Sequence, residues 1–364
     1  MKEKEQLILQ LIRQNPFIAQ SELAERLGLS RSAVAGYISS LMKQGKIIGR
    51  AYVLPEPSRI VCIGGANVDR KAQADASIQF GTSNPVSVTQ TCGGVARNIA
   101  EMLGKLGQPV SLITVVGDDQ EGDWLLSTTS AYVDISQTVK FKGTNTGTYT
   151  AVLDGSGEMV VALADMAIYD AISPDFIQKR WPHISSASAV LLDTNFSSEV
   201  LSFVIGRCRE EGIPLCVVPV STPKVKKLPK DLRGVTWFIA NEEEAFALAG
   251  REGTVEAAID AILSLGVENI IVTRGARGIV YKNKQTHGQI PAPKIDVVDV
   301  TGAGDAFVSG FLYGINRGES FVRACKLGMS SSIITLQTNE TVCSQVTEQM
   351  IKETYQHYFS LEEL

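Results

Sequence analysis

The sequence is most informative at Asp299-Val300-Thr301-Gly302-Ala303-Gly304-Asp305-Ala306-Phe307. Gly302 and Gly304 relieve the steric limit on φ, so that successive backbone N–H groups can converge on one anion. A helix that begins at about Gly304 would add the positive end of its dipole at the same point. Asp305 then lies one residue further on, where its carboxylate can accept a proton from an attacking hydroxyl. The stretch therefore predicts a phosphoryl-transfer site.

Two common phosphate-binding motifs do not fit this segment. No Lys-Ser or Lys-Thr pair follows the glycines, as a Walker A loop requires, and the spacing is not the Gly-x-Gly-x-x-Gly of a dinucleotide fingerprint. A simpler interpretation is a tight strand-to-helix turn in which Asp305 only caps the helix. The residues of this segment alone leave both interpretations open.

The composition predicts a globular, soluble protein with more than one domain. The chain has 364 residues, of which 44% are hydrophobic and 20% charged, which is enough for a large packed core. No apolar run approaches the roughly 18 residues of a membrane-spanning helix, and the charged N-terminus leads into an amphipathic stretch instead of a signal sequence. We therefore expect a cytoplasmic protein. Six dispersed cysteines and three histidines form no zinc-binding pattern.

Residues 1–55 differ from the rest in charge and pattern. They hold eight Lys/Arg and four Asp/Glu, a net charge of +4, whereas residues 56–364 hold 26 and 35, a net charge of −9. Apolar residues at helical spacing predict three helices, with breaks at Asn15-Pro16 and Gly28 and an N-cap at Ser30. We expect a helix-turn-helix domain over residues 1–55 and a second domain over residues 56–364.

The first domain resembles the winged helix domains of bacterial transcription regulators. Lys46–Leu54 predicts a two-stranded wing, and Pro55-Glu56-Pro57 predicts a stiff linker. In such domains the start of the third helix enters the major groove of DNA, and a dimer is needed for useful affinity. The alternative is a three-helix module used for dimerisation or docking. The residues that the resemblance assigns to operator DNA are Arg31 for a base contact, Ser32 beside it at the start of the third helix, and Lys43, Lys46 and Arg50 for phosphates.

From Arg59 onward, buried apolar runs alternate with helical segments. This alternation predicts an α/β fold with a mostly parallel sheet covered by helices on both faces, where ligands bind beyond the carboxyl ends of the strands. The expected strands are Ile60–Gly64, Val110–Gly117, Ala189–Asp193, Leu215–Pro219, Thr236–Asn241 and Asn269–Thr273. Residues 146–165 alternate instead as a hairpin around Gly155-Ser156-Gly157. With residues 69–92, the segment 141–165 predicts a small antiparallel lid.

Polar and glycine-rich segments follow several of these strands. Asn241–Glu244 can organise a hydrated Mg²⁺ through carboxylate and amide oxygens, or simply begin a helix whose dipole the glutamates complement. Thr273–Gly278 has glycines that permit close approach of a phosphate, and its two arginines either neutralise that phosphate or are surface charges. Asn67 and Asp69 suit the vicinal hydroxyls of a sugar. The pair Gly93-Gly94 opens a helix that contains Asn98, and it lets a sugar lie against the backbone.

In their order along the chain, these motifs resemble the ribokinase (PfkB-type) family of carbohydrate and nucleoside kinases, from Arg59 nearly to the end. The resemblance implies a ribokinase-like fold and ATP-dependent kinase activity. It implies that Asp305 is the catalytic base and that the amides of Gly302, Ala303 and Gly304 form an anion hole. One departure is Val218, where many members carry Asp or Asn before a proline, and we expect it to loosen a supporting contact without abolishing activity.

The resemblance also implies the remaining ligands. The sugar is assigned to Asn67, Asp69, Gly93, Gly94 and Asn98. ATP is assigned to Asn241, Thr273, Gly275, Gly278 and Asn339. Magnesium is assigned to Asn241 and Glu244 through water, and a monovalent cation such as K⁺ to Asp299 and Thr301.

Within the family, the chain resembles most closely the pseudouridine kinases and their relatives that carry a helix-turn-helix. The resemblance rests on Ser83-Asn84-Pro85, on Thr148–Met159, on Ala164–Met166 and on Asp193-Thr194-Asn195. It implies phosphorylation of the 5′-hydroxyl of pseudouridine. Thr148, Asp165 and Met166 would face the base, or would only pack the lid.

Three other functions remain compatible with the sequence. The first two are a kinase for another nucleoside, such as inosine, uridine or cytidine, and a kinase for free ribose. The third is a transcription regulator that keeps the kinase fold as a ligand sensor. An intact Asp305 and anion hole favour catalysis, because a sensor needs no general base.

Overall fold

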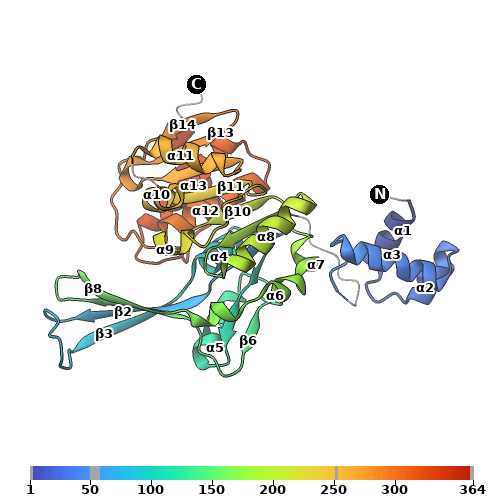
Figure 1. Ribbon diagram of the computed structural model, residues 1–364, viewed down its shortest axis with the longest axis horizontal. Helices are drawn as coiled ribbons and strands as arrows, with labels where there is room; N and C mark the ends of the chain where they lie inside the picture. Colours follow the sequence, from blue (N-terminus) through green and yellow to red (C-terminus); the bar gives the residue numbers. More distant parts are fainter. Residues whose placement is uncertain (1–2, 50–57, 251–252, 361–364) are drawn as a thin grey trace.

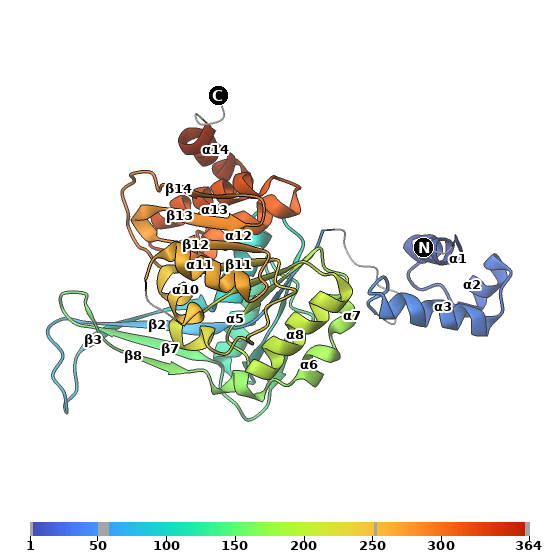
Figure 2. The ribbon, with the colours of Figure 1, turned by 45° about the horizontal axis from the view of Figure 1, so that its top comes forward.

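The protein's structure is a computed structural model that describes residues 3–49, 58–250 and 253–360. Three helices near the N-terminus stand at one end of the molecule, beside α7 (Trp181–Ile184), and a sheet of four strands projects from the opposite end (Figure 1). Figure 2 shows the same arrangement after a rotation. Among the described residues, none of the helices is long and apolar enough to cross a membrane.

The N-terminal helices are α1 (Glu3–Gln14), α2 (Gln20–Leu27) and α3 (Arg31–Lys43). They pack around a small core of their own, which includes Ile12, Leu23 and Leu41. The predicted signals are present: Gly28 ends α2 with a φ of 62°, and Ser30 Oγ accepts a hydrogen bond from the Ala33 amide at 3.2 Å. The described part of the predicted wing, residues 46–49, contains no strand. Residues 50–57 lie outside the described part of the chain.

A sheet of eight strands forms the centre of the larger unit, in the order β14-β13-β12-β11-β10-β9-β1-β4. The first six along the chain run parallel, and β13 and β14 are antiparallel. Their bounds are β1 Ile60–Ile63, β4 Val110–Ile113, β9 Ala189–Asp193, β10 Leu215–Val218, β11 Trp237–Asn241, β12 Asn269–Thr273, β13 Ile279–Asn283 and β14 His287–Ile290.

The predicted strand Val110–Gly117 is two strands. Only β4 belongs to the central sheet. The chain turns at Thr114, and β5 (Val115–Gly117) pairs with β6 (Val139–Phe141) in a separate two-stranded sheet. The sequence pattern does not reveal such a turn, because both strands are buried and the two polar residues of the segment, Ser111 and Thr114, are buried as well.

Helices cover both faces of the central sheet, as the alternation of segments predicts. In β1, Ile60 and Cys62 belong to one core cluster, and Val61 and Ile63 belong to the other. The helices that contribute most to the first cluster are α4 (Val95–Lys105), α12 (Ala303–Asn316), α13 (Phe321–Leu336) and α14 (Glu348–Phe359). The α-helices that contribute most to the second are α6 (Pro174–Gln178), α7, α8 (Ser198–Glu211), α10 (Glu242–Ala249) and α11 (Val255–Ser264). Shorter or peripheral elements are α5 (Gln120–Thr129), η1 (Ala167–Ala171), α9 (Thr222–Val225) and η2 (Gly275–Arg277).

The projecting sheet has the strand order β3-β2-β7-β8. Its strands are β2 (Asn67–Ala74), β3 (Val86–Gly93), β7 (Thr148–Leu153) and β8 (Met159–Asp165). The predicted hairpin is present, because β7 and β8 pair antiparallel.

The strand register divides this sheet into two faces. The inner face is defined by Asn67, Asp69 and Lys71, and the outer face by Val68 and Arg70. Lys71 Nζ lies 3.8 Å from Asp299 Oδ2. The inner face is therefore turned toward the Asp299–Asp305 segment.

Candidate active site

The N-terminus of α12 has the geometry that was predicted for an anion site. Gly302 precedes the helix with a φ of 79°, in the left-handed region, and α12 begins at Ala303, one residue before the predicted start. A side chain at Gly302 would overlap the carbonyl oxygen of Thr341. Gly304 is exposed, and a Cβ added there meets no atom within 4 Å. The first amides of a 14-residue helix thus lie beside open space, where its dipole favours negative charge.

Asp305 lies in the first turn of α12 and is hydrogen-bonded to α4. Asn98 Nδ2 donates to Asp305 Oδ2 at 2.8 Å. Burial raises the pKa of Asp305 to about 7, the Asn98 hydrogen bond opposes this shift, and the nearby carboxylates of Asp193 and Asp69 add to it. A carboxylate with a pKa near neutrality is suited to accept a proton from a hydroxyl.

A buried arginine holds the Asn98 amide in this orientation. Arg97 is 2% exposed, and its Nη1 donates to Asn98 Oδ1 at 3.1 Å. Arg97 also forms a buried ion pair with Glu101. Because the amide oxygen of Asn98 is occupied by a donor, its nitrogen is the atom that faces Asp305.

The predicted sugar-binding residues lie together. Asn67 Nδ2 donates to Asp69 Oδ1 at 2.6 Å, on the inner face of the projecting sheet. Burial raises the pKa of Asp69 to about 6, against the effects of the Asn67 hydrogen bond and the Arg97 charge. A side chain at Gly93 would overlap the Asp69 carboxylate, so glycine is required where the carboxylate passes β3.

The close packing around the Gly93-Gly94 pair continues at Gly94. This residue has a φ of 100°, and a Cβ there would lie 2.7 Å from the Cα of Ala66. Gly94 directly precedes α4, the helix that carries Asn98. The glycine pair therefore lets the start of α4 lie against the loop that follows β1.

Asp193 is a residue of this region for which the sequence predicts no role. It is fully buried at the carboxyl end of β9 and accepts hydrogen bonds from the amides of Gly65 at 2.8 Å, Ala96 at 3.1 Å and Asn195 at 2.9 Å. It thereby joins the loop after β1 to the start of α4. An acidic residue at the end of a fully apolar strand was the signal that could have identified it.

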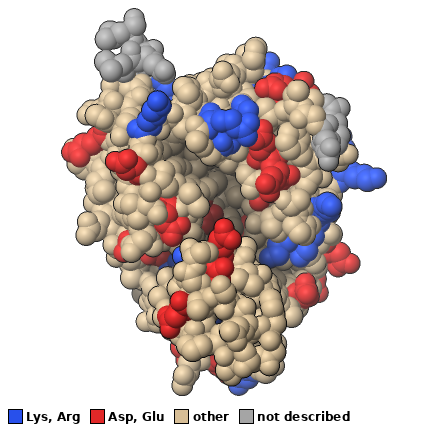
Figure 3. Space-filling model, turned by 90° about the vertical axis from the view of Figure 1, so that its left-hand side faces the viewer, with Lys and Arg blue, Asp and Glu red and all other residues tan. Residues whose placement is uncertain are grey.

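The carboxylates of this region lie close enough to disfavour one another's ionisation. Asp69, Asp193 and Glu244 each raise the pKa of Asp305. In the surface view, the molecule is hollowed above the projecting sheet, and acidic side chains border the hollow (Figure 3). A polyanionic substrate therefore requires cations or amide donors here.

Asn241 and Glu244 form a capping box at the start of α10. Asn241 Oδ1 accepts the Glu244 amide at 2.9 Å, and Glu244 Oε2 accepts the Asn241 amide at 3.0 Å. Glu244 is buried, and burial raises its pKa. The box supports the helix-start interpretation, but it uses Oε2, so that Glu244 Oε1 can still contact a metal-bound water. In the described ranges, no three His, Cys, Asp or Glu residues group as direct metal ligands. This donor set fits a hydrated Mg²⁺ that is held mainly by water and phosphate.

The predicted ATP loop follows β12. Thr273 is the register partner of Asn241, so these two predicted ATP-binding residues are neighbours. Gly275 and Gly278 have φ values of 55° and 83° in the turn between β12 and β13. Arg274 and Arg277 both form ion pairs with Glu242 in this structure.

Asp299 and Thr301, predicted to bind a monovalent cation, contact each other. Asp299 Oδ1 accepts hydrogen bonds from the Thr301 amide at 2.9 Å and from its hydroxyl at 2.8 Å. Asp299 Oδ2 faces Lys71. The second carboxylate oxygen thus lies where a cation is favourable.

The three residues predicted to face the base do not lie together. Thr148 and Asp165 pair with each other, and Thr148 pairs with Val68, so both belong to the outer face and not to the face of Asp69. With Arg70 they border a pocket of about 450 Å³. Met166 lies nearer to the sugar residues: a Cβ added to Gly147 would lie 3.2 Å from Met166 Sδ and 3.5 Å from Asn67 Cβ.

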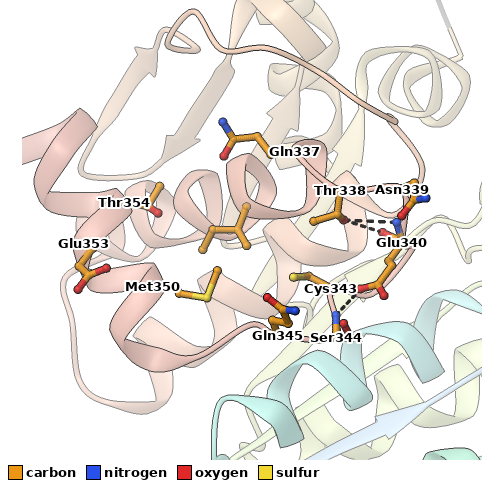
Figure 4. Close-up of a pocket in the computed structure, with 11 residues that line it drawn as sticks. Gln337, Thr338, Asn339, Glu340, Cys343, Ser344, Gln345, Met350, Glu353 and Thr354 are labelled. Carbon is orange, nitrogen blue, oxygen red and sulfur yellow. Dashed lines mark hydrogen bonds between the residues drawn. The ribbon is translucent and has the colours of Figure 1, made fainter.

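Asn339 lies apart from the other predicted residues. It borders a pocket of about 470 Å³ between the end of α13 and α14 (Figure 4). No other predicted site residue borders this pocket.

The predicted DNA-contacting side chains surround both ends of α3. Arg31, Ser32 and Lys43 are exposed, and Lys46 is half-buried with its Nζ 2.7 Å from Gln44 Oε1. Arg50 lies outside the described residues.

Comparison with known protein families identifies the larger part of the chain as an ATP-dependent kinase. Residues 57–347 match the pfkB family carbohydrate kinase model, and residues 1–48 match a winged helix-turn-helix DNA-binding model. The chain therefore belongs to the pfkB family of carbohydrate kinases.

Three known proteins illustrate the similarity. An uncharacterized sugar kinase of Escherichia coli strain K12 is 32% identical over 341 residues, covering 92% of this chain and 94% of that protein. That match includes part of the N-terminal helices. The pseudouridine kinase of the same organism is 32% identical over 295 residues, covering 79% and 93%. The structure of a carbohydrate kinase from Agrobacterium tumefaciens has a TM-score of 0.73 and 29% identity, covering 82% and 97%.

Proposed function

We propose that this protein is a pseudouridine kinase, which transfers the γ-phosphoryl group of ATP to the 5′-hydroxyl of pseudouridine. The observation that carries the proposal is the convergence of two hydrogen-bonded pairs, Asn67–Asp69 and Asn98–Asp305, beside the N-terminus of α12. One pair offers partners for ribose hydroxyls, and the other offers a base for a third hydroxyl. The 32% identity to a pseudouridine kinase supports the choice of nucleoside.

In the proposed reaction, Asp69 and Asn67 bind ribose hydroxyls, and Gly93 and Gly94 let the ring approach the backbone. Asp305 accepts the proton of the 5′-hydroxyl as that oxygen attacks the γ-phosphorus of ATP, and the bond from this phosphorus to the bridging oxygen breaks, so that ADP leaves. The amides at Gly302, Ala303 and Gly304 stabilise the charge on the transferring group, which is the main protein contribution in phosphoryl transfer.

The proposed ATP site lies along the ends of β11 and β12. Asn241, Thr273, Gly275 and Gly278 would contact the nucleotide, and Asn339 would approach it from the loop after α13. Glu244 and Asn241 would hold Mg²⁺ through water, and this ion neutralises phosphate charge when bound. Asp299 and Thr301 would hold a monovalent cation such as K⁺ beside the anion hole.

A substrate screen tests the choice of nucleoside. Purified protein is incubated with ATP, Mg²⁺ and either pseudouridine, uridine, cytidine, inosine, adenosine or ribose, and product is measured at several substrate concentrations. We expect the highest kcat/KM for pseudouridine. A higher kcat/KM for inosine, for another nucleoside or for ribose would show that this compound, and not pseudouridine, is the preferred substrate. Absence of product from every acceptor would support a ligand sensor instead.

We further propose that residues 1–55 form a domain that binds operator DNA, and that residues 56–364 form the kinase domain, with segments 69–92 and 141–165 as a lid. The net charge of +4 and the exposed Arg31 at the start of α3 support DNA binding. Two copies would be needed to span paired half-sites. Exposed apolar residues on the outer face of the lid, including Val88 and Leu163, are consistent with a homodimer.

A further inference from the structure

The inner face of the lid carries an aromatic residue directly beside the proposed sugar site. Tyr149 of β7 is the register partner of Asp69 of β2, so the two side chains lie on the same face. Ala164 of β8 is the next partner across. Sequence reasoning selected the neighbouring Thr148, whose side chain lies on the outer face.

The ring of Tyr149 lies along the sheet and remains accessible. Its hydroxyl is 4.0 Å from Met159 Sδ, five residues nearer the tip of β8 than Ala164, so the ring extends toward the tip of the lid. The Tyr149 side chain is 36% exposed although it faces the body of the protein. Ala151 and Ala162 form the next inner-face pair, so no large side chain covers the ring from that position.

The two halves of the inner face differ in chemistry. The half formed by β2 carries the polar residues Asn67, Asp69 and Lys71. The half formed by β7 and β8 carries Tyr149 and three alanines beside these polar residues, with the apolar pair Leu153 and Met159 nearer the tip. Neighbouring strands lie about 4.8 Å apart, a distance comparable to the step from a ribose to the centre of its base. This division matches a molecule with hydroxyls at one end and a planar ring at the other.

We propose that Tyr149 is a specificity-determining residue that stacks on the nucleobase, so that the site selects nucleosides over free ribose. The inference rests on the proposed nucleoside kinase function. Stacking of a base on an aromatic side chain tolerates different bases. Tyr149 therefore distinguishes a nucleoside from a sugar, and does not distinguish pseudouridine from uridine.

Three variants of Tyr149 and one control test this role. Tyr149→Phe keeps the ring, Tyr149→Leu keeps apolar bulk without a ring, and Tyr149→Ala removes both. The control is Phe80→Ala, which removes an aromatic ring that is 85% exposed in the loop between β2 and β3. Each variant is assayed for KM and kcat with pseudouridine and uridine. Free ribose is tested as a substrate and as an inhibitor of nucleoside phosphorylation.

We expect Tyr149→Ala to raise the KM for both nucleosides about tenfold or more, with ribose affinity unchanged. The nucleoside KM of Tyr149→Phe and of Phe80→Ala should match that of the wild type. The nucleoside KM of Tyr149→Leu should lie between those of Tyr149→Phe and Tyr149→Ala. Three results would overturn the stacking role. They are an unchanged nucleoside KM in Tyr149→Ala, an equal nucleoside KM in Tyr149→Leu and Tyr149→Phe, and a loss of ribose affinity as large as the loss of nucleoside affinity. If Tyr149→Ala does not fold, the comparison of leucine with phenylalanine decides. Failure of the wild type to phosphorylate any nucleoside would instead contradict the proposed function.

Discussion

Asn98 and Asp305 are 207 positions apart in the sequence and are joined by a hydrogen bond of 2.8 Å from Asn98 Nδ2 to Asp305 Oδ2. This bond connects α4, the helix that follows the glycine pair, to α12, the helix that begins at the proposed anion hole. It opposes the increase in pKa that burial causes at Asp305. A residue of the proposed sugar site thus lowers the pKa of the residue proposed as the base.

The first prediction concerns the pH dependence of the reaction. Burial raises the pKa of Asp305 from 3.8 to about 7, so the carboxyl keeps its proton below this pH and cannot act as a base. We expect kcat/KM to rise about tenfold per pH unit below neutrality and to level off above it. A pH series with the best substrate checks this, and a profile flat from pH 5 to 8 would contradict it.

The second prediction concerns stability. The folded-state pKa of Asp305 lies above its unfolded value, so the folded protein binds more protons between 3.8 and about 7. Its stability should therefore decrease as pH rises through this window, and the loss persists above it. Asp305→Asn cannot ionise and should melt a few degrees higher than the wild type at pH 8, with little difference at pH 4. Equal melting temperatures of the variant and the wild type at pH 8 would contradict the claim that the ionised Asp305 carboxylate destabilises the fold.

The third prediction concerns the sugar residues. Asp69→Ala removes a partner from a ribose hydroxyl and also leaves Asn67 Nδ2 without its acceptor. We expect KM for the nucleoside to rise by a factor corresponding to roughly 1 to 3 kcal/mol, with a smaller effect on the KM for ATP. Steady-state kinetics with each substrate varied in turn checks this. Unchanged constants for every nucleoside would exclude Asp69 from the sugar site.

The fourth prediction concerns DNA. If residues 1–55 bind an operator, affinity should fall steeply as salt rises, because phosphate contacts release counterions. Arg31→Ala should weaken binding, and nucleoside should shift affinity by a factor consistent with roughly 1 to 3 kcal/mol of coupling. The measurement is a titration against DNA from upstream of the protein's own gene, at low and moderate salt, with and without nucleoside. If DNA binding survives deletion of residues 1–55, this segment is a docking module and not a reader of DNA.

The sequence predicted the six parallel strands of the central sheet, because buried parallel strands read as apolar runs and glycines mark the turns, but it did not predict the antiparallel strands β13 and β14. It also predicted Gly302, whose left-handed φ requires glycine. It did not predict which face of the lid is turned inward. Alternation places Thr148 and Tyr149 on opposite faces, but only the pairing of Tyr149 with Asp69 shows which of them lies beside the sugar residues.

The sequence pattern likewise did not predict contacts between residues that are far apart along the chain. The hydrogen bonds from Gly65 and Ala96 to Asp193 join residues about a hundred or more positions apart, and no local pattern specifies them. The break at Thr114 was missed for a related reason. Both strands beside it are buried, so the segment reads as one buried strand although the partner strand changes.

The central claim is that Asp305 is the catalytic base, and the turnover of Asp305→Asn tests it most directly. The asparagine is similar in size and can keep the contact with Asn98, but it cannot accept the proton. We predict a loss in kcat of about 10²- to 10⁴-fold, with nucleoside and ATP affinities measured by calorimetry nearly unchanged. A variant that retains more than half of the wild-type kcat would contradict the account.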